Sequence, residues 1–189
     1  MSETVTSAFG EGLIELLAQR GRQSSARPVR LIVLGDRSRG DDAVAYAAAH
    51  KALAGLPEPV RARIDVRETG QLDPADLVEI PDGGAAVIVD SVVGVPPGQL
   101  VSLPLAEIEP AAEGMPVPRS SHVLPVDQLV ALAGALRGGD PPGVLVGVGA
   151  ERFGFGDPLT PAVARAIPGL AGAIRRELER LVAGLEPAP

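Results

Sequence analysis

The segment 34–45, with the sequence LGDRSRGDDAVA, constrains the fold more than any other part of the chain. It follows the apolar run 30–34 and leads into a helix predicted over 42–55. A strand, a turn with two glycines and a helix that starts at two adjacent acids are typical of the carboxyl edge of a sheet. Open α/β sheets bind ligands at this edge, so Asp41 and Asp42 are candidate functional residues.

Apolar strands and helices alternate along the rest of the chain. Near-continuous apolar strands between helices are typical of a parallel sheet that is covered on both faces. Strands are predicted at 30–35, 62–67, 85–90, 99–103 and 144–149, and helices at 42–55, from Asp73 and Pro74, at 125–136, and from Thr160 toward Leu185. The sequence therefore predicts an α/β fold with a mainly parallel sheet of about five strands and helices on both faces.

The domain organisation is expected to be simple. A single α/β domain is predicted over 30–185, with an N-terminal extension at 1–29 and a tail at 186–189. Apolar side chains at roughly helical spacing predict a short helix within 9–20 of the extension. Two interpretations of that helix stay open, docking on the domain and binding to a partner.

Composition excludes several classes of function. Aromatic residues make up only 2% of the chain, so the core must consist of Ala, Val, Leu and Ile. The net charge of −7 argues against nucleic-acid binding, and the absence of cysteine excludes disulfides, cysteine zinc sites and thiol nucleophiles. Neither a membrane-spanning stretch nor a secretory signal is apparent in the sequence, so we expect a cytoplasmic protein.

Two further residues are expected near Asp42. Asp90 closes the apolar strand at 85–89, and His122 follows two serines in a loop. Two carboxylates and one imidazole suit borderline divalent ions such as nickel, zinc, iron or manganese. Three protein ligands leave a position open for water or substrate, and a metal there can activate water or polarise a carbonyl.

Each candidate also has a purely structural interpretation. One acid of the pair 41–42 could cap the following helix and complement its dipole. Asp90 could accept backbone N–H groups at the strand end, and His122 could be a solvated loop residue. His50 is expected to be a surface or packing residue. These alternatives stay open on the residues alone.

The blocks together resemble the hydrogenase maturation endopeptidases, which trim the C-terminus of the large subunit of nickel-iron hydrogenase after nickel insertion. The family's first turn, G-N-x-L-x-x-D-[DE]-G-x-G, is matched without a gap by 35–45. Its strand end I-I-x-D-A is matched by 88–91, and its S-S-H loop by 120–122. Its late strand and loop, L-V-G-V-x-P-E followed by G-L-T-P-x-V, are matched within 145–163. The resemblance spans about 29–180 of this chain.

The resemblance implies a metal-dependent, aspartic-type endopeptidase, a hydrolase that activates a hydrogenase by processing it. Asp42, Asp90 and His122 are then both the catalytic residues and the metal contacts. The implied metal is the nickel of the large-subunit precursor, for which zinc or another divalent ion could substitute. The implied partner is that precursor, and a monomer is favoured.

The first turn departs from the family pattern. Asp36 stands in place of the usual asparagine, Ser38 in place of an apolar residue, and Ala43 and Ala45 in place of glycines. These differences favour, as an alternative, a family member that binds metal and a hydrogenase subunit as an assembly chaperone without cutting it.

Other residues of the first turn have possible roles in catalysis or substrate binding. Asp36 or Asp41 could act as a base, and Arg37 and Arg39 could grip a substrate carboxylate or be simply solvated. A phosphoacceptor receiver domain is disfavoured because the only lysine, Lys51, precedes Asp90. A scaffold in which all three candidate ligands are structural is the remaining alternative.

Overall fold

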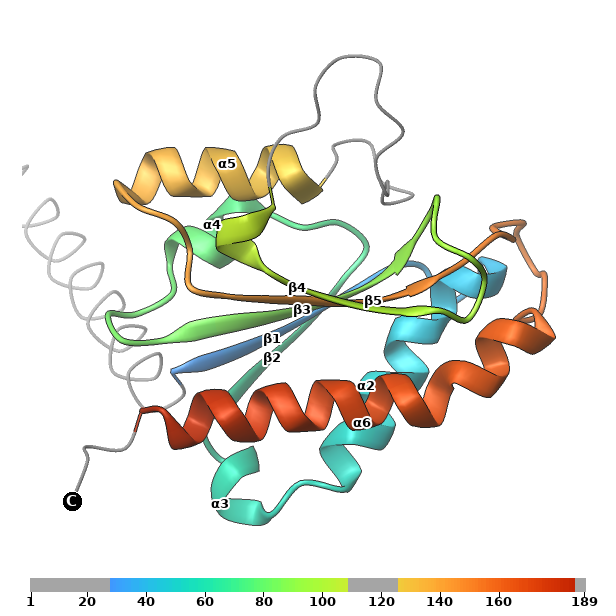
Figure 1. Cartoon of the computed structure of the whole chain (residues 1–189), viewed down its shortest axis with the longest axis horizontal. Helices are drawn as coiled ribbons and strands as arrows, with labels where there is room; N and C mark the ends of the chain where they lie inside the picture. The colour runs from blue at the N-terminus through green and yellow to red at the C-terminus, as the bar shows by residue number, and fades with distance from the viewer. Residues whose placement is uncertain (1–27, 109–125, 186–189) are drawn as a thin grey trace, which may run out of the picture.

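A computed structural model describes residues 28–108 and 126–185 and shows a five-stranded sheet in the order β2-β1-β3-β5-β4 (Figure 1). The strands are β1 (Val29–Leu34), β2 (Ile64–Thr69), β3 (Ala85–Val92), β4 (Leu100–Pro104) and β5 (Gly143–Gly149). β1, β2, β3 and β5 pair in parallel, and β4 pairs antiparallel with β5. The prediction of a mainly parallel sheet is confirmed. The predicted N-terminal helix and the tail lie outside the described residues.

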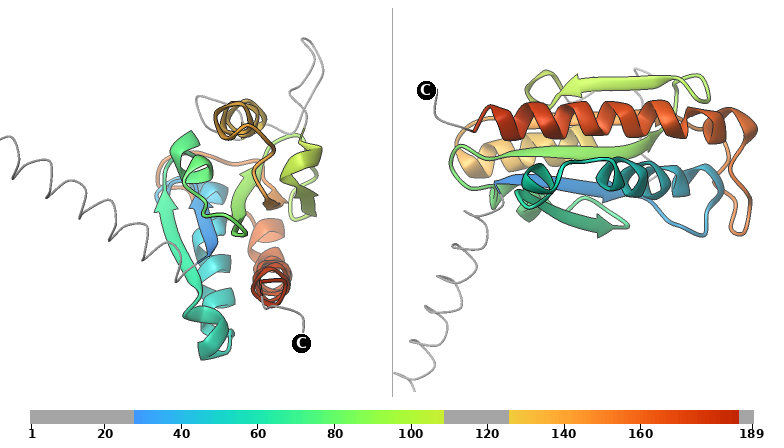
Figure 2. Two further views of the ribbon diagram at one scale, coloured as in Figure 1. Left: turned by 90° about the vertical axis from the view of Figure 1, so that its left-hand side faces the viewer. Right: turned by 90° about the horizontal axis from the view of Figure 1, so that it is seen from below.

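Helices cover both faces of the sheet, as predicted (Figures 1 and 2). The α-helices are α2 (Val44–Ala54), α3 (Glu58–Arg61), α4 (Pro74–Val78), α5 (Val126–Arg137) and α6 (Pro161–Ala183), and two 3-10 helices are η1 (Gly40–Ala43) and η2 (Leu105–Glu107). α2 and α6 pack on one face, and α4 and α5 on the other. No helix within the described ranges is long and apolar enough to cross a membrane.

The core consists of two aliphatic layers separated by the sheet. Leu31 and Val33 of β1 pack toward α2 and α6, whereas Ile32 and Leu34 pack toward α4 and α5. This alternation follows from the two-residue period of a strand, and it lets one short apolar run serve both layers. Burial of β1 on both faces explains why its sequence is almost continuously apolar.

Two predicted elements are displaced. The predicted strand 62–67 begins two residues later, because the unpredicted helix α3 and its C-terminal turn occupy the residues before it. Val66 in β2 is 40% exposed because β2 is an edge strand. The predicted helix 42–55 consists of η1 followed by α2.

Strand lengths determine where the sheet ends. Pairing between β1 and β3 stops at Val33 and Val89, whereas β3 continues beside β5 to Val92. Asp90, the residue after Val89, is therefore level with Leu34, the last residue of β1, just before the turn that begins at Gly35.

Both glycines of this first turn are required by the backbone. Gly35 has φ +124° and Gly40 has φ +47°, values that side-chain-bearing residues rarely adopt. A Cβ on Gly35 would lie 2.4 Å from the carbonyl oxygen of Asp42, and one on Gly40 would lie 2.5 Å from that of Arg152. The turn therefore packs backbone against backbone, both within itself and against the loop at 150–160.

We predict that Gly40→Ala destabilises the protein by about 2 kcal/mol or more, because it adds left-handed strain and a collision with the backbone at Arg152. The control is Gly70→Ala, because a Cβ on Gly70 meets nothing within 4 Å and no positive φ is involved. Urea unfolding measures both variants. Equal stability of Gly40→Ala and wild type would contradict the close packing of this turn.

Candidate functional site at the carboxyl edge of the sheet

The order of the strands creates a topological switch point between β1 and β3. After β1 the chain adds β2 on one side, and then returns to add β3 on the other side of β1. Open α/β sheets bind ligands at such switch points, outside the carboxyl ends of the strands. The segment after β1 contains Asp42, and the end of β3 contains Asp90. The two predicted acids therefore lie at the edge where the topology places a ligand site.

Asp42 lies in η1, and its carboxylate is buried, with 3% of the residue exposed. Its Oδ1 accepts a hydrogen bond of 2.8 Å from the hydroxyl of Ser91, and its Oδ2 accepts one of 2.8 Å from the backbone N–H of Asp36. One oxygen is thus tied to β3 and the other to the first turn. These two bonds fix the orientation of the carboxylate.

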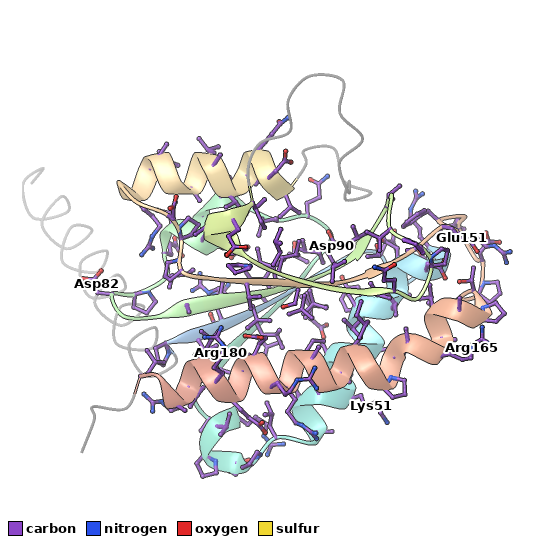
Figure 3. The ribbon with its side chains drawn as sticks, in the orientation of Figure 1. Lys51, Asp82, Asp90, Glu151, Arg165 and Arg180 are labelled. Atoms are coloured by element: carbon purple, nitrogen blue, oxygen red, sulfur yellow. The ribbon has the colours of Figure 1, made fainter. Side chains whose placement is uncertain are left out.

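Asp90 is buried more deeply, with 1% exposed, and lies in the interior of the molecule (Figure 3). Its Oδ1 accepts a hydrogen bond of 2.8 Å from the N–H of Ser91. Strand alternation places Asp90 on the α4 and α5 face with Ile88, and Ser91 on the α2 and α6 face with Val89. Ser91 therefore contacts both carboxylates, one through its backbone and one through its side chain.

The third predicted ligand, His122, lies outside the described residues. Within the described ranges, no group of three or more His, Asp or Glu side chains is placed to hold a metal ion. The structure thus brings Asp42 and Asp90 into one buried cluster around Ser91, and the metal role of the three residues stays a prediction.

Asp41, the neighbour of Asp42, has a different environment. It is fully buried, and its carboxylate accepts four hydrogen bonds from the segment 151–160. Thr160 donates through its N–H at 2.7 Å and its hydroxyl at 3.1 Å, and the N–H groups of Glu151 and Arg152 donate at 3.2 and 3.1 Å. The N–H of Asp41 in turn donates to the carbonyl of Arg152 at 2.7 Å. Asp41 thus joins the first turn to the loop between β5 and α6.

The structure corrects the helix-cap interpretation of the acid pair. Neither η1 nor α2 has a side-chain hydrogen bond at its N-cap, which is Arg39 in η1 and Ala43 in α2. Both acids instead bond to distant segments. Thr160 is the N-cap residue of α6 as predicted, but its hydroxyl donates to Asp41 rather than capping the helix.

Neither acid suggested as a base is suited to that role. The carboxylate of Asp41 is engaged by its four donors. Asp36 accepts bonds from the hydroxyl and the N–H of Ser38, and together with nearby Arg39 these bonds hold its pKa below the usual value. A carboxylate with a lowered pKa is a weaker base.

The arginines of the first turn are exposed and bonded to acids. Arg37 pairs with Glu68 and stacks over the ring of Tyr46 at 4.3 Å from its centroid, and Arg39 lies 3.3 Å from Asp36. The Tyr46 hydroxyl donates to the carbonyl of Gly35 at 2.8 Å, so this cluster supports the start of the turn.

His50, expected at the surface or in packing, lies at the surface with its side chain 61% exposed, and its Nε2 is 2.8 Å from Glu68. Although partial burial acts to raise the pKa of Glu68, its bonds to His50 and Arg37 hold that pKa below the usual value. Arg37, His50 and Glu68 therefore support the turn at the surface and do not contribute to the cluster of buried acids.

Sequence reasoning missed Ser91 and the structural role of Asp41. The signal for Ser91 was its position directly after a strand-ending acid, where a polar hydroxyl in an apolar strand needs a partner. No comparable signal linked Asp41 to Thr160, because the two residues are far apart in sequence.

The fold is shared with solved structures of hydrogenase maturation proteases. The [NiFe] hydrogenase maturation protease HycI from Thermococcus kodakarensis aligns with 80% of this chain and 92% of its own, at 20% identity and a TM-score of 0.59. The maturation protease HybD from Thermococcus kodakarensis aligns with 78% of this chain and 97% of its own, at 23% identity and a TM-score of 0.57. The hydrogenase maturating endopeptidase HybD from E. coli aligns with 80% and 92%, at 19% identity and a TM-score of 0.58.

No protein-family model and no curated protein sequence matches the chain. The structural matches cover most of each solved chain, but at low sequence identity. The chain is thus similar in fold to these proteases, and the resemblance indicated by the sequence motifs is confirmed at the level of the fold.

We predict that Asp41→Asn destabilises the protein by about 2–4 kcal/mol, because an amide nitrogen in place of one carboxylate oxygen faces N–H or hydroxyl donors. The control is Asp82→Asn at an exposed position, for which a change within about 0.5 kcal/mol is expected. Denaturant unfolding measures both. A small effect at Asp41 would show that its bonds do not hold the two loops together.

Proposed function

We propose that this protein is an endopeptidase that removes the C-terminal extension of a nickel-iron hydrogenase large-subunit precursor after nickel insertion. The observation that carries the proposal is the buried pair Asp42 and Asp90, joined through Ser91 at the switch point of the sheet. The fold shared with maturation proteases supports the same activity.

In this proposal the nickel belongs to the substrate, and Asp42, Asp90 and His122 contact it. Carboxylate and imidazole ligands suit a borderline ion such as nickel, and zinc or another divalent ion could take its place. Only a precursor that carries the metal would then be held in the position for cleavage.

The position of α5 supports the assignment of His122. Arg137, at the end of α5, donates to the carbonyls of Leu77, Val78 and Ile80, which precede β3 at the amino edge of the sheet. A helix of 12 residues is about 18 Å long, so α5 begins nearer the carboxyl edge. His122 precedes Val126, the first residue of α5, by four positions. This direction of α5 is the reason that we propose His122 as the third contact.

In this proposal the substrate's metal and the residues of this chain have different roles in the reaction. Nickel of the precursor, held by Asp42, Asp90 and His122, would supply Lewis-acid chemistry at the scissile carbonyl. The task of the chain is to hold and orient that metal and to exclude bulk water, which strengthens electrostatic interactions in the site. The rigid support of both acids suits this task, because neither has to reorganise when substrate binds.

A serine triad is not supported by the part of the chain that the structure describes. His50, the one histidine there, is at the surface and bonds to Glu68. The hydroxyl of Ser91 is buried and donates to Asp42.

The alternative is a chaperone that binds the metal and the hydrogenase subunit without cutting. It is favoured by the turn itself, in which Asp36 and Ser38 bond to each other. This closed arrangement replaces the asparagine and the apolar residue of the family pattern.

Cleavage of a nickel-loaded precursor distinguishes the two functions. We predict that only the nickel-loaded precursor loses its C-terminal peptide when mixed with the protein, because the metal is the recognition element. Intact-mass spectrometry before and after incubation measures the loss, and a nickel-free precursor is the control. Equal cleavage of the nickel-free precursor would contradict metal sensing, and a stable complex without cleavage would favour the chaperone.

Asp42→Asn and Asp90→Asn are each predicted to lower the cleavage rate by about 100-fold, because a neutral amide holds the cation less strongly than a carboxylate does. His122→Ala is predicted to do the same. Single-turnover cleavage measures the rates, and Asp82→Asn provides an exposed control. Wild-type rates in all three variants would assign these residues to a structural role.

A further inference from the structure

We infer that Ser91 is a positioning residue that orients both acidic metal contacts, Asp42 and Asp90, relative to each other. The inference rests on the proposed function, since it assumes that these acids contact a metal. It is carried by the two hydrogen bonds that Ser91 donates, one from its backbone N–H to Asp90 and one from its hydroxyl to Asp42.

The two bonds orient acids that come from separate parts of the chain. Asp90 is the direct neighbour of Ser91 in β3, and the Ser91 N–H restricts its side chain at 2.8 Å. Asp42 comes from η1, and the Ser91 hydroxyl reaches across to it at 2.8 Å. The relative placement of the two carboxylates is therefore set through one residue.

Ser91 is a rigid reference point. It is fully buried, and it pairs with Val148 of β5 while Asp90 pairs with Gly147. A buried hydroxyl without a partner is costly, so its bond to Asp42 is strongly favoured over an alternative rotamer that faces aliphatic neighbours.

An alanine at position 91 could not form the side-chain hydrogen bond to Asp42. With alanine at position 91 the N–H would still bond to Asp90, but Asp42 would lose the donor at Oδ1. A carboxylate has about four lone-pair sites, so Asp42 can accept the Ser91 hydroxyl at Oδ1 and the Asp36 N–H at Oδ2 and also contact a metal. Groups that orient metal ligands in this way typically contribute 10- to 100-fold to metal affinity.

The test measures binding of Ni²⁺ alone to the full chain, by competition with a chromophoric chelator. Ser91→Ala is expected to weaken binding by about 10- to 100-fold. Ser91→Thr retains the hydroxyl in a strand that tolerates β-branched residues, and is expected to restore affinity to within about threefold of wild type.

Val87→Ala is the matched control, because Val87 is buried in β3 on the same face as Ser91 but contains no polar atom. It is expected to lower stability without changing the affinity for Ni²⁺. The visible spectrum of bound Co²⁺ provides a second measurement, which should change in Ser91→Ala and not in Val87→Ala, because it reports ligand geometry rather than stability.

The outcomes separate this inference from the proposed function. If Asp42→Asn abolishes Ni²⁺ binding but Ser91→Ala keeps wild-type affinity and spectrum, the role of Ser91 is overturned and the metal contacts stand. If wild-type protein binds neither Ni²⁺ nor Co²⁺, the metal contacts themselves fail, and the inference fails with them. An equal loss of affinity in Val87→Ala would assign the effect to stability and would also overturn the inference.

Discussion

A buried carboxylate is stable only where donors replace the water that it loses, and the geometry of this site depends on how Asp41 meets that requirement. Its four hydrogen bonds all come from the segment 151–160, which the chain reaches only after completing the sheet. The first turn is therefore held by a loop that is distant in sequence. Asp42 lies in the same 3-10 helix, so its position depends on the bonds of its neighbour.

The two adjacent acids thus have separate tasks, and their surroundings explain the division. Asp41 accepts hydrogen bonds from the backbone N–H groups of Glu151, Arg152 and Thr160. Asp42 points to the hydroxyl of Ser91 and so to the end of β3. Asp41 holds the first turn against the segment 151–160. Asp42 bonds to the end of β3, which contains Asp90. A ligand site at a switch point needs both kinds of contact, because its two sides belong to segments that meet only in the folded chain.

Much of this arrangement could be predicted from the sequence, because it follows from local pattern. The apolar run of β1 and the glycines at positions 35 and 40 predicted a turn at the carboxyl edge. The predicted helix start at Asp73 is also confirmed, because the Asp73 side chain caps α4 by accepting the N–H of Ala75. The start of β2 was wrong by two residues because α3 is too short to show a helical period. The bonds of Asp41 and Ser91 could not be predicted, since they join residues whose proximity depends on strand order and register.

The residues of the first turn that differ from the family pattern do not displace Asp41 or Asp42. Ala43 has helical backbone angles, φ −72° and ψ −11°, and Ala45 is fully buried in α2, so a methyl group at each position suits the helix better than glycine does. Asp36 still donates its N–H to Asp42, while its own carboxylate bonds to Ser38 and lies near Arg39. Of these substitutions, Asp36 lies at the exposed side of the turn, whereas Ala45 lies in the core. The bonds that orient Asp42, from the N–H of Asp36 and the hydroxyl of Ser91, are compatible with all of these substitutions, because none of them removes a donor to Asp42.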